Sequence, residues 1–249
     1  MAALESRTIS RPNMVNSLND PDAVRKEYAD EKRYAARMAK QKTATGPDPY
    51  DVVFAAVAER EPREVLEVGC GRGELAERMS RELAARVVAL DQSARMVELT
   101  AARGVDAVVG DVVNLPFDDG SFDCAVAAWM LYHAADLDQA LAELRRVLRP
   151  AGRLVAATSS ERNLAEVWEL VGEIGAPGGA FTVESASAAL LRHFGHVERR
   201  DIAGTVTFVT RQAAYEYLAA TRSSAVADLL PDFTAPLVAS RRLAVFVCA

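Results

Sequence analysis

Three evenly spaced glycines follow an acidic residue in the first strongly apolar segment of the chain. The run Val-Leu-Glu-Val-Gly-Cys-Gly-Arg-Gly covers residues 65–73 and contains Glu67, Gly69, Gly71 and Gly73. Glycine permits backbone angles closed to other residues, and it lets a ligand approach the positive N-terminal end of the next helix. The dinucleotide fingerprint needs a further glycine where this chain has Glu74, and the Gly-Lys-Ser/Thr end of a P-loop is missing. The turn therefore suits a nucleoside ligand that carries no pyrophosphate.

Two acidic residues stand where they could bind such a ligand. Glu67 interrupts an apolar run, and because a buried unpaired carboxylate is costly, it either caps nearby backbone amides or contacts the ligand. Asp91 ends the second apolar run, about twenty residues beyond the glycine turn, as the ribose-binding acid does in nucleotide-binding folds. A carboxylate there can accept hydrogen bonds from both ribose hydroxyls, or it can simply be stabilised by the positive N-terminal end of the next helix. The glycine turn and Asp91 together favour the ligand.

Aromatic and basic side chains end the fourth apolar run, in the segment Ala128-Trp129-Met130-Leu131-Tyr132-His133. In open α/β sheets, ligands bind beyond the carboxyl ends of the strands. Trp129 and Tyr132 can line a pocket there and favour a cation through their ring faces, or they can pack beneath a loop. His133 can accept a proton from a substrate hydroxyl or amine, or it can bond a backbone carbonyl.

The elements that must position these residues alternate along the chain. Apolar runs predict strands at 64–68, 86–90, 105–109, 122–128 and 153–158, and helical periodicity predicts helices at 50–60, 74–84, 93–103 and 136–149. Near-continuous apolar strands separated by helices indicate a parallel sheet with helices on both faces. Further helices are predicted at 22–42, 163–175, 184–194 and near 211–222, and strands near 196–209 and at 243–247.

Composition restricts the class of protein. The 249 residues form one large domain or a domain with a cap, and the net charge of −6 argues mildly against a nucleic-acid partner. Three widely spaced cysteines are typical of buried thiols in a reducing compartment. With no signal core and no apolar run long enough to cross a bilayer, a cytoplasmic protein without membrane partners is expected. His193 and His196 have no cysteine or acidic cluster beside them, so no metal site is predicted.

Residues 65–73 resemble motif I of the class I S-adenosylmethionine (SAM) dependent methyltransferases. Two further segments support the resemblance. Residues 110–123 are similar to the family's adenine-reading stretch, and residues 141–155 are similar to its RVLKPGG signature, with Ala151 in place of the first glycine. The resemblance covers roughly residues 50–158, and the small-molecule methyltransferases are the type it favours.

The resemblance implies a Rossmann-like fold with a seven-stranded, mostly parallel sheet whose closing strand, 243–247, is antiparallel. It also implies SAM as the cofactor. In that case Glu67 helps to hold the methionine part, Asp91 the ribose and Asp111 the adenine amine, while the Val112 backbone meets the ring. Met96 lies against the adenine or fills the core. The full set of expected cofactor contacts is Glu67, Gly69, Cys70, Gly71, Gly73, Asp91, Gln92, Met96, Asp111, Val112, Ala128 and Trp129.

The regions outside the resemblance are expected to cover the substrate. Residues 1–45 are interpreted as an N-terminal helical lid, because the amphipathic stretch 22–42, which includes Tyr28, precedes a Gly/Pro-rich hinge. Residues 46–249 form the SAM-binding domain, with cap insertions at about 160–195 and 210–240. Tyr28, Tyr132 and His133 are the candidate substrate contacts.

The expected reaction is transfer of the SAM methyl group to an oxygen, nitrogen or carbon of a small molecule, for example in secondary metabolism. Positioning the nucleophile in line with the leaving sulfur can supply most of the rate gain, so a base is optional and His133 is the candidate. An RNA or protein methyltransferase is disfavoured by the acidic balance and by the lack of an Asn/Asp-Pro-Pro-Tyr/Phe motif after the fourth strand. A SAM-binding protein without transfer activity is the third alternative.

Overall fold

The computed structural model describes residues 40–173, 179–221 and 224–249. Tyr28 and all but the end of the predicted helix 22–42 lie outside these ranges, so the lid stays a prediction. Residues Lys40–Thr43 form a short 3-10 helix, η2. The segment after it is tied to the C-terminal part of the fold, since the Thr45 amide donates to the Thr205 carbonyl at 2.9 Å.

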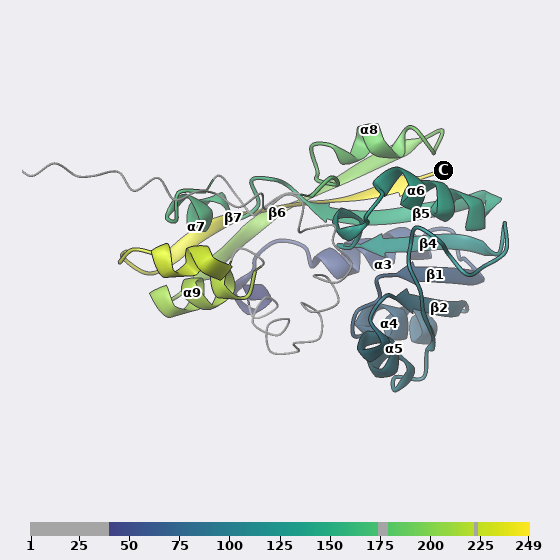
Figure 1. Cartoon of the computed structure of the whole chain (residues 1–249), viewed down its shortest axis with the longest axis horizontal. Helices are drawn as coiled ribbons and strands as arrows, with labels where there is room; N and C mark the ends of the chain where they lie inside the picture. The colour runs from purple at the N-terminus through teal and green to yellow at the C-terminus, as the bar shows by residue number, and fades with distance from the viewer. Residues whose placement is uncertain (1–39, 174–178, 222–223) are drawn as a thin grey trace, which may run out of the picture.

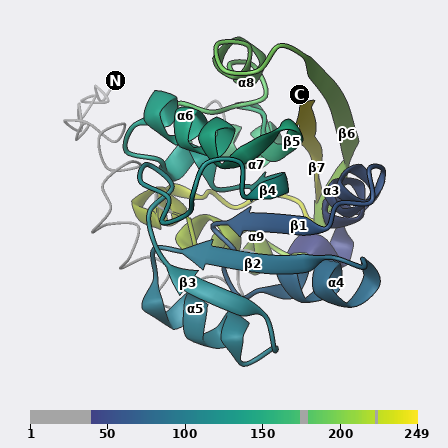
Figure 2. The ribbon, with the colours of Figure 1, turned by 90° about the vertical axis from the view of Figure 1, so that its right-hand side faces the viewer.

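The described residues form a seven-stranded sheet in the order β3-β2-β1-β4-β5-β7-β6. Its strands are β1 (Glu64–Val68), β2 (Arg86–Asp91), β3 (Asp106–Val109), β4 (Phe122–Ala128), β5 (Leu148–Ser159), β6 (Val197–Phe208) and β7 (Leu237–Cys248). Strands β1 to β5 are mutually parallel, and β7 lies antiparallel between β5 and β6. The predicted fold class is therefore confirmed. The strand order reverses between β1 and β4, and this reversal positions the site (Figure 2).

Helices connect and cover the strands. They are α3 (Pro49–Ala58), α4 (Glu74–Glu82), α5 (Ala94–Ala101), α6 (Leu137–Val147), α7 (Ala165–Glu169), α8 (Ala186–Leu190) and α9 (Arg211–Ala219), with the 3-10 helices η3 (Leu131–His133) and η4 (Ser224–Leu229). Side-chain caps explain where several begin: Asp48, Ser93, Asp136 and Thr210 each accept a hydrogen bond from a backbone amide two or three residues ahead.

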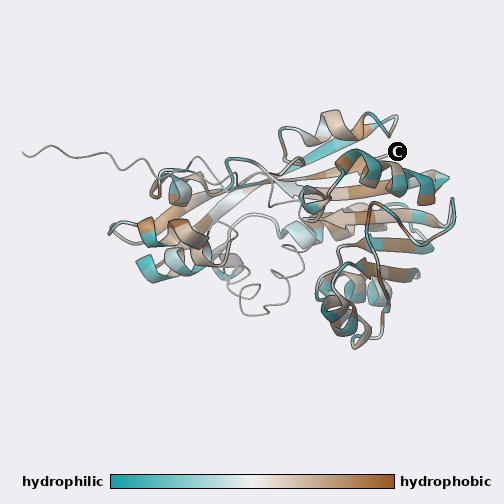
Figure 3. Ribbon diagram, in the orientation of Figure 1, coloured by the Kyte–Doolittle hydropathy of each residue, from teal (hydrophilic) through white to brown (hydrophobic). Residues whose placement is uncertain are grey.

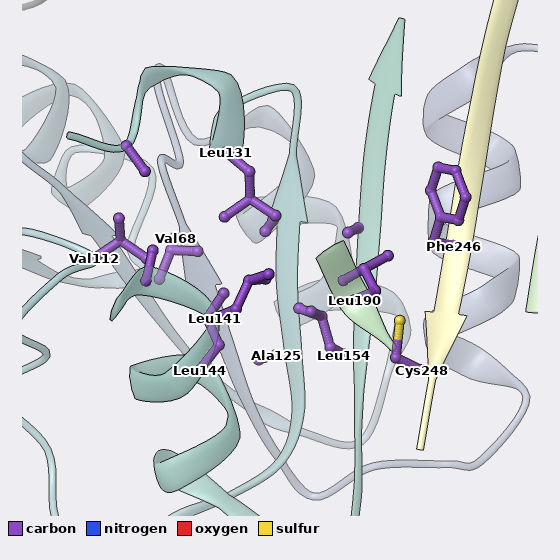
Figure 4. Packing of buried hydrophobic residues seen from close by; sticks show 14 of the residues in the cluster. Val68, Val112, Ala125, Leu131, Leu141, Leu144, Leu154, Leu190, Phe246 and Cys248 are labelled. Atoms are coloured by element: carbon purple, nitrogen blue, oxygen red, sulfur yellow. The ribbon is translucent and has the colours of Figure 1, made fainter. Parts of the chain in front are cut away.

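Alternating strand residues build a core on each face of the sheet. On one face, Leu141 and Leu144 of α6 and Leu190 of α8 pack on strand residues such as Ala125 and Leu154 (Figure 4). On the other face, α3 and α4 cover the strand residues of opposite parity. Figure 3 shows the apolar residues along the central strands and hydrophilic residues on the outer surfaces of the helices.

Two strands are much longer than their apolar runs predict. The strand expected at 153–158 extends over Leu148–Ser159, and the one expected at 243–247 extends over Leu237–Cys248. By contrast, the helix expected at 163–175 is shorter than predicted, since α7 covers only Ala165–Glu169. For the two strands, pairing with distant partners decides the length: β7 pairs with β6 along its whole extent, and β5 begins where Leu148 pairs with Phe122 of β4.

The far halves of β6 and β7 continue beyond β5 as a two-stranded ribbon that carries its own core (Figure 1). Helices α7 and α9 and the 3-10 helix η4 pack on it through Trp168, Tyr217 and Ala227, among others. Side chains replace the missing neighbour strand, since the Arg242 amide donates to Asn163 Oδ1 at 2.9 Å and the Ser240 amide to Glu166 Oε2 at 2.8 Å. Parts of both predicted insertions thus pack together as one unit, called the cap below, and its position over a substrate stays a prediction. In the described ranges, no helix has the length and apolarity needed to span a membrane.

Candidate cofactor cleft

A cleft lies at the carboxyl ends of β1, β2, β3 and β4, where the strand order reverses. Including the open solvent at its mouth, about 640 Å³ of space lies between its walls. Its described lining residues are Gly69, Gly71, Leu90, Asp91, Gln92, Gly110, Asp111, Val112, Trp129, Met130, His133, Ala134 and Ala135.

The three glycines of the turn are required for two different reasons. All three adopt positive φ angles, +68° at Gly69, +56° at Gly71 and +77° at Gly73. A Cβ on Gly69 would lie 2.6 Å from Met130 Cβ, and one on Gly73 would lie 2.6 Å from Thr100 Oγ1. A Cβ on Gly71 would meet nothing within 4 Å, although Gly71 lines the cleft. Gly69 and Gly73 are therefore required by packing, whereas Gly71 keeps space open for a ligand.

Asp91 joins the glycine turn to the next helix. Its Oδ2 accepts from the Gly71 amide at 3.0 Å and its Oδ1 from the Ser93 amide at 2.9 Å. Burial raises the pKa of Asp91, and the amide bonds from Ser93, Gly71 and Gln92 oppose that rise. Each carboxylate oxygen has a second acceptor site, so Asp91 can hold the turn and still accept ribose hydroxyls from the cleft. The two interpretations of Asp91 are compatible.

Glu67 lies behind the turn and does not line the cleft. It is 4% exposed, and its Oε2 has no hydrogen-bond partner among the described residues. Burial raises the pKa of Glu67 to about 8, the charges of Asp91 and Glu74 add to the rise, and a hydrogen bond from the Ala76 backbone opposes it. The contact with Ala76 matches the amide-capping interpretation, and contact with the methionine part of a cofactor stays a prediction.

Of the other predicted cofactor residues, Gln92, Asp111, Val112 and Trp129 line the cleft. Four do not: Cys70, Gly73, Met96 and Ala128. Met96 is only 1% exposed, which favours its role as a core residue. The lining residues that were not predicted are Leu90, Gly110, Met130, Ala134 and Ala135. Each is within three residues of a predicted one, so proximity in sequence was the available signal.

His133 and Trp129, the residues predicted to line the pocket after the fourth strand, lie in the same cleft as Asp91. His133 lies in η3, and its amide donates to the Met130 carbonyl at 2.8 Å. Its ring contacts the edge of Tyr132, with 4.4 Å between centroids, but Tyr132 does not line the cleft. Trp129 has a left-handed φ of 55°, and its ring packs against Tyr50 at 5.0 Å. Residues in such strained conformations are concentrated at functional sites.

The other histidines lie elsewhere. His193 Nε2 is 2.9 Å from Asp138 Oδ1 on α6, and neither residue lines the cleft. No group of three or more His, Cys, Asp or Glu residues in the described part of the chain is arranged to hold a metal ion.

The buried carboxyl of Glu67 predicts a pH-dependent stability. A carboxyl whose pKa is raised on folding stabilises the fold fully below its ordinary value of 4.5, and this stabilisation is lost as the pH rises through about 8. Across that window, we expect Glu67 to lower the free energy of unfolding of the cofactor-free protein by about 1.4 kcal/mol per pH unit. Urea denaturation between pH 5 and 9 measures the slope.

The Glu67→Gln variant should lack this part of the slope. Glu64→Gln, at the start of the same strand, is the matched control and should keep it. If Glu67→Gln and the wild type follow parallel curves, Glu67 keeps the same proton affinity in both states and the prediction is wrong.

Known proteins share this sequence and fold in part. Residues 66–156 match a family model described as a methyltransferase domain. A malonyl-acyl-carrier-protein O-methyltransferase from Pseudescherichia vulneris is 35% identical over 126 residues, 49% of this chain and 50% of that protein. A ubiquinone/menaquinone biosynthesis C-methyltransferase from Hahella chejuensis is 37% identical over 107 residues, 39% of this chain and 43% of the relative. The chain thus matches half or less of the length of these curated relatives.

A solved structure from Thermotoga maritima has the same fold. It is described as a SAM-dependent methyltransferase, possibly a histamine N-methyltransferase, and it aligns with a TM-score of 0.58 at 19% identity, covering 89% of this chain and 96% of that one. The sheet order and the cleft beyond a glycine turn define a Rossmann-like methyltransferase domain. Residues 66–156 thus match a methyltransferase domain, and the described chain has the fold of a solved SAM-dependent methyltransferase.

Proposed function

We propose that this protein transfers a methyl group from SAM to a small-molecule acceptor. The observation that carries the proposal is the Gly71 amide bound to Asp91 at the edge of an open cleft. This contact supports a cofactor-binding role for the turn and a ribose-binding role for Asp91. The space beside Gly71 supports the fit, because a Cβ at that position would meet no protein atom within 4 Å.

The residues of this chain would divide the work of binding. Asp91 would accept the ribose hydroxyls and Asp111 the adenine amine, while Val112 would meet the adenine ring. Asp111 is held for this role by the Val113 amide, which donates to its Oδ1 at 3.2 Å. When bound, SAM supplies a methyl group on a positively charged sulfur. The ring of Trp129 would face that charge, and the imidazole of His133 would take the proton from an acceptor hydroxyl or amine.

The acceptor class is the finer part of the proposal. The two curated relatives are named for O- and C-methylation, and we propose that this chain likewise methylates an oxygen, nitrogen or carbon of a small molecule. None of the described cleft-lining residues is Lys or Arg, which argues against an RNA acceptor. We further propose that the cap covers the acceptor. The three cysteines are unpaired and buried, which supports a reducing, cytoplasmic location.

The Asp91→Ala variant tests the cofactor assignment. We expect it to bind S-adenosylhomocysteine about 10- to 150-fold more weakly than the wild type, since a charge-assisted hydrogen bond contributes about 1.5–3 kcal/mol. Isothermal calorimetry gives both Kd values. Asp106→Ala is the control, because Asp106 begins β3 at the other end of the sheet and pairs with Arg86 at 3.3 Å. Equal affinity in Asp91→Ala and the wild type would remove Asp91 from the ribose contact.

Release of S-adenosylhomocysteine from SAM tests the activity itself. The acceptors to assay are hydroxylated quinols, carboxyl thioesters and amines, together with RNA and bulk protein as the alternative classes. Turnover with a small molecule supports the proposal. Tight SAM binding without turnover of any acceptor would instead favour a non-catalytic SAM-binding protein.

A further inference from the structure

We propose that Thr100 and Arg103, at the end of α5, are positioning residues that hold the glycine turn in its cofactor-binding shape. The inference rests on the proposed function, and it assigns a role to a helix end that does not line the cleft. Glycine restricts the backbone less than any other residue, so a glycine-rich turn depends on other contacts to keep one shape. A turn that is already held in shape loses less conformational freedom when the cofactor binds, so the affinity rises.

Thr100 holds the turn through a buried hydrogen bond to its backbone. Its side chain is fully buried, and its Oγ1 donates to the Gly71 carbonyl at 3.2 Å. The same hydroxyl lies 3.5 Å from Cys70 Sγ and occupies the space that a Cβ on Gly73 would need. Thr100 therefore contacts Cys70, Gly71 and Gly73 of the turn.

The peptide groups of Gly71 are consequently held on both sides. The Gly71 amide donates to Asp91 Oδ2 at 3.0 Å on the side of the cleft. The Gly71 carbonyl accepts from Thr100 on the opposite side. With both groups bonded, Gly71 keeps its positive φ of +56°, and Asp91 keeps the orientation that the ribose requires. Thr100 thus acts on the ligand through Gly71 and Asp91.

Arg103 holds the other half of the turn. Its Nε donates to the Arg72 carbonyl at 2.6 Å. Its guanidinium also bonds two acids at the start of α4, Glu77 at 2.6 Å and Glu74 at 3.4 Å. A planar guanidinium can bond a carbonyl and two carboxylates at once, so Arg103 ties the turn to the first turn of the following helix.

Calorimetry with S-adenosylhomocysteine tests the proposal. Thr100→Val removes the hydroxyl at nearly constant volume, and we expect about a 3- to 10-fold higher Kd, the usual effect of one hydrogen bond. Thr100→Ser keeps the hydroxyl and should restore most of the affinity. Thr158→Val is the matched control: Thr158 is equally buried and donates to the Phe181 carbonyl at 2.8 Å, outside the cleft. Thr158→Val should lose about as much stability as Thr100→Val and keep the wild-type Kd.

Arg103 gives a second test that survives if Thr100→Val does not fold. Arg103→Ala should raise the Kd about 3- to 10-fold. Arg78→Ala should not, although Arg78 also pairs with two carboxylates, Asp51 and Glu82, on the same side of the fold. Wild-type affinity in Thr100→Val, or in Arg103→Ala where the first variant is unfolded, overturns the positioning role. Absence of binding by the wild type would overturn the proposed function instead.

Discussion

The Gly71→Val variant is expected to fold and to bind S-adenosylhomocysteine up to about 100-fold more weakly than the wild type. A Cβ at Gly71 meets no protein atom within 4 Å, so the valine side chain disturbs no packing in the free protein. It would occupy the cleft that Gly71 lines. Overpacking a tight site typically costs about 1–3 kcal/mol, and the upper end of that range corresponds to about a 100-fold change in Kd.

The strain of a left-handed valine must be separated from the loss of space. Gly104→Val is suited to this, because Gly104 has a φ of +82°, meets nothing within 4 Å at its Cβ position and does not line the cleft. Both variants should lose about 1–2 kcal/mol of stability, as measured by thermal unfolding followed by circular dichroism. Only Gly71→Val should lose binding in calorimetry. If Gly71→Val binds S-adenosylhomocysteine with the wild-type Kd, the turn does not face the cofactor.

The His133→Asn variant is expected to turn over about 10²- to 10⁴-fold more slowly, the range for losing a general base. His133 lines the same cleft as Asp91 and Trp129, and we propose that its imidazole takes the proton that leaves the acceptor. Imidazole changes charge between about pH 5 and 8, so turnover of the wild type should rise with pH in that window. The pH–rate profile of His133→Asn should be flat there, and its affinity for S-adenosylhomocysteine should change little.

A structural histidine would behave differently. In that case His133→Asn would lose stability and keep its rate per folded molecule. His193→Asn provides the comparison, since His193 is a half-buried histidine whose ring contacts Asp138 at 2.9 Å, outside the cleft. An acceptor carbon or amine that is already deprotonated needs no base. Identical profiles at full activity would therefore remove His133 from the mechanism.

Local patterns in the sequence were sufficient for the sheet and for the main residues of the cleft. The apolar runs at 64–68, 86–90 and 122–128 predicted β1, β2 and β4 closely, because strands buried on both faces need uninterrupted apolar residues. Asp91 and the glycine turn could be related from their spacing alone, because parallel strands bring their carboxyl ends to one edge of the sheet. Their hydrogen bond in the fold is the direct consequence.

The direction of individual side chains could not be read in the same way. Glu67 does not line the cleft and its contact with a ligand stays a prediction, whereas Leu90 and Ala134 line the cleft and were not expected. Successive residues of a strand point to opposite faces, so a shift of one position exchanges core and site. The packing of Thr100 beneath Gly71 depends on the approach of α5 to the turn, which no short-range pattern encodes.

The sequence by itself thus determined the parallel sheet, the position of its glycine turn and the acid that accompanies it. All of these follow from periodicity and from spacing along short stretches of chain. Only the tertiary structure decided the lengths of β5 and β7, the packing of α7 and α9 on the far ends of β6 and β7, and the support that Thr100 and Arg103 give to the turn. These features depend on contacts between residues far apart in the chain, whose energies come from pairing and packing rather than from local preference.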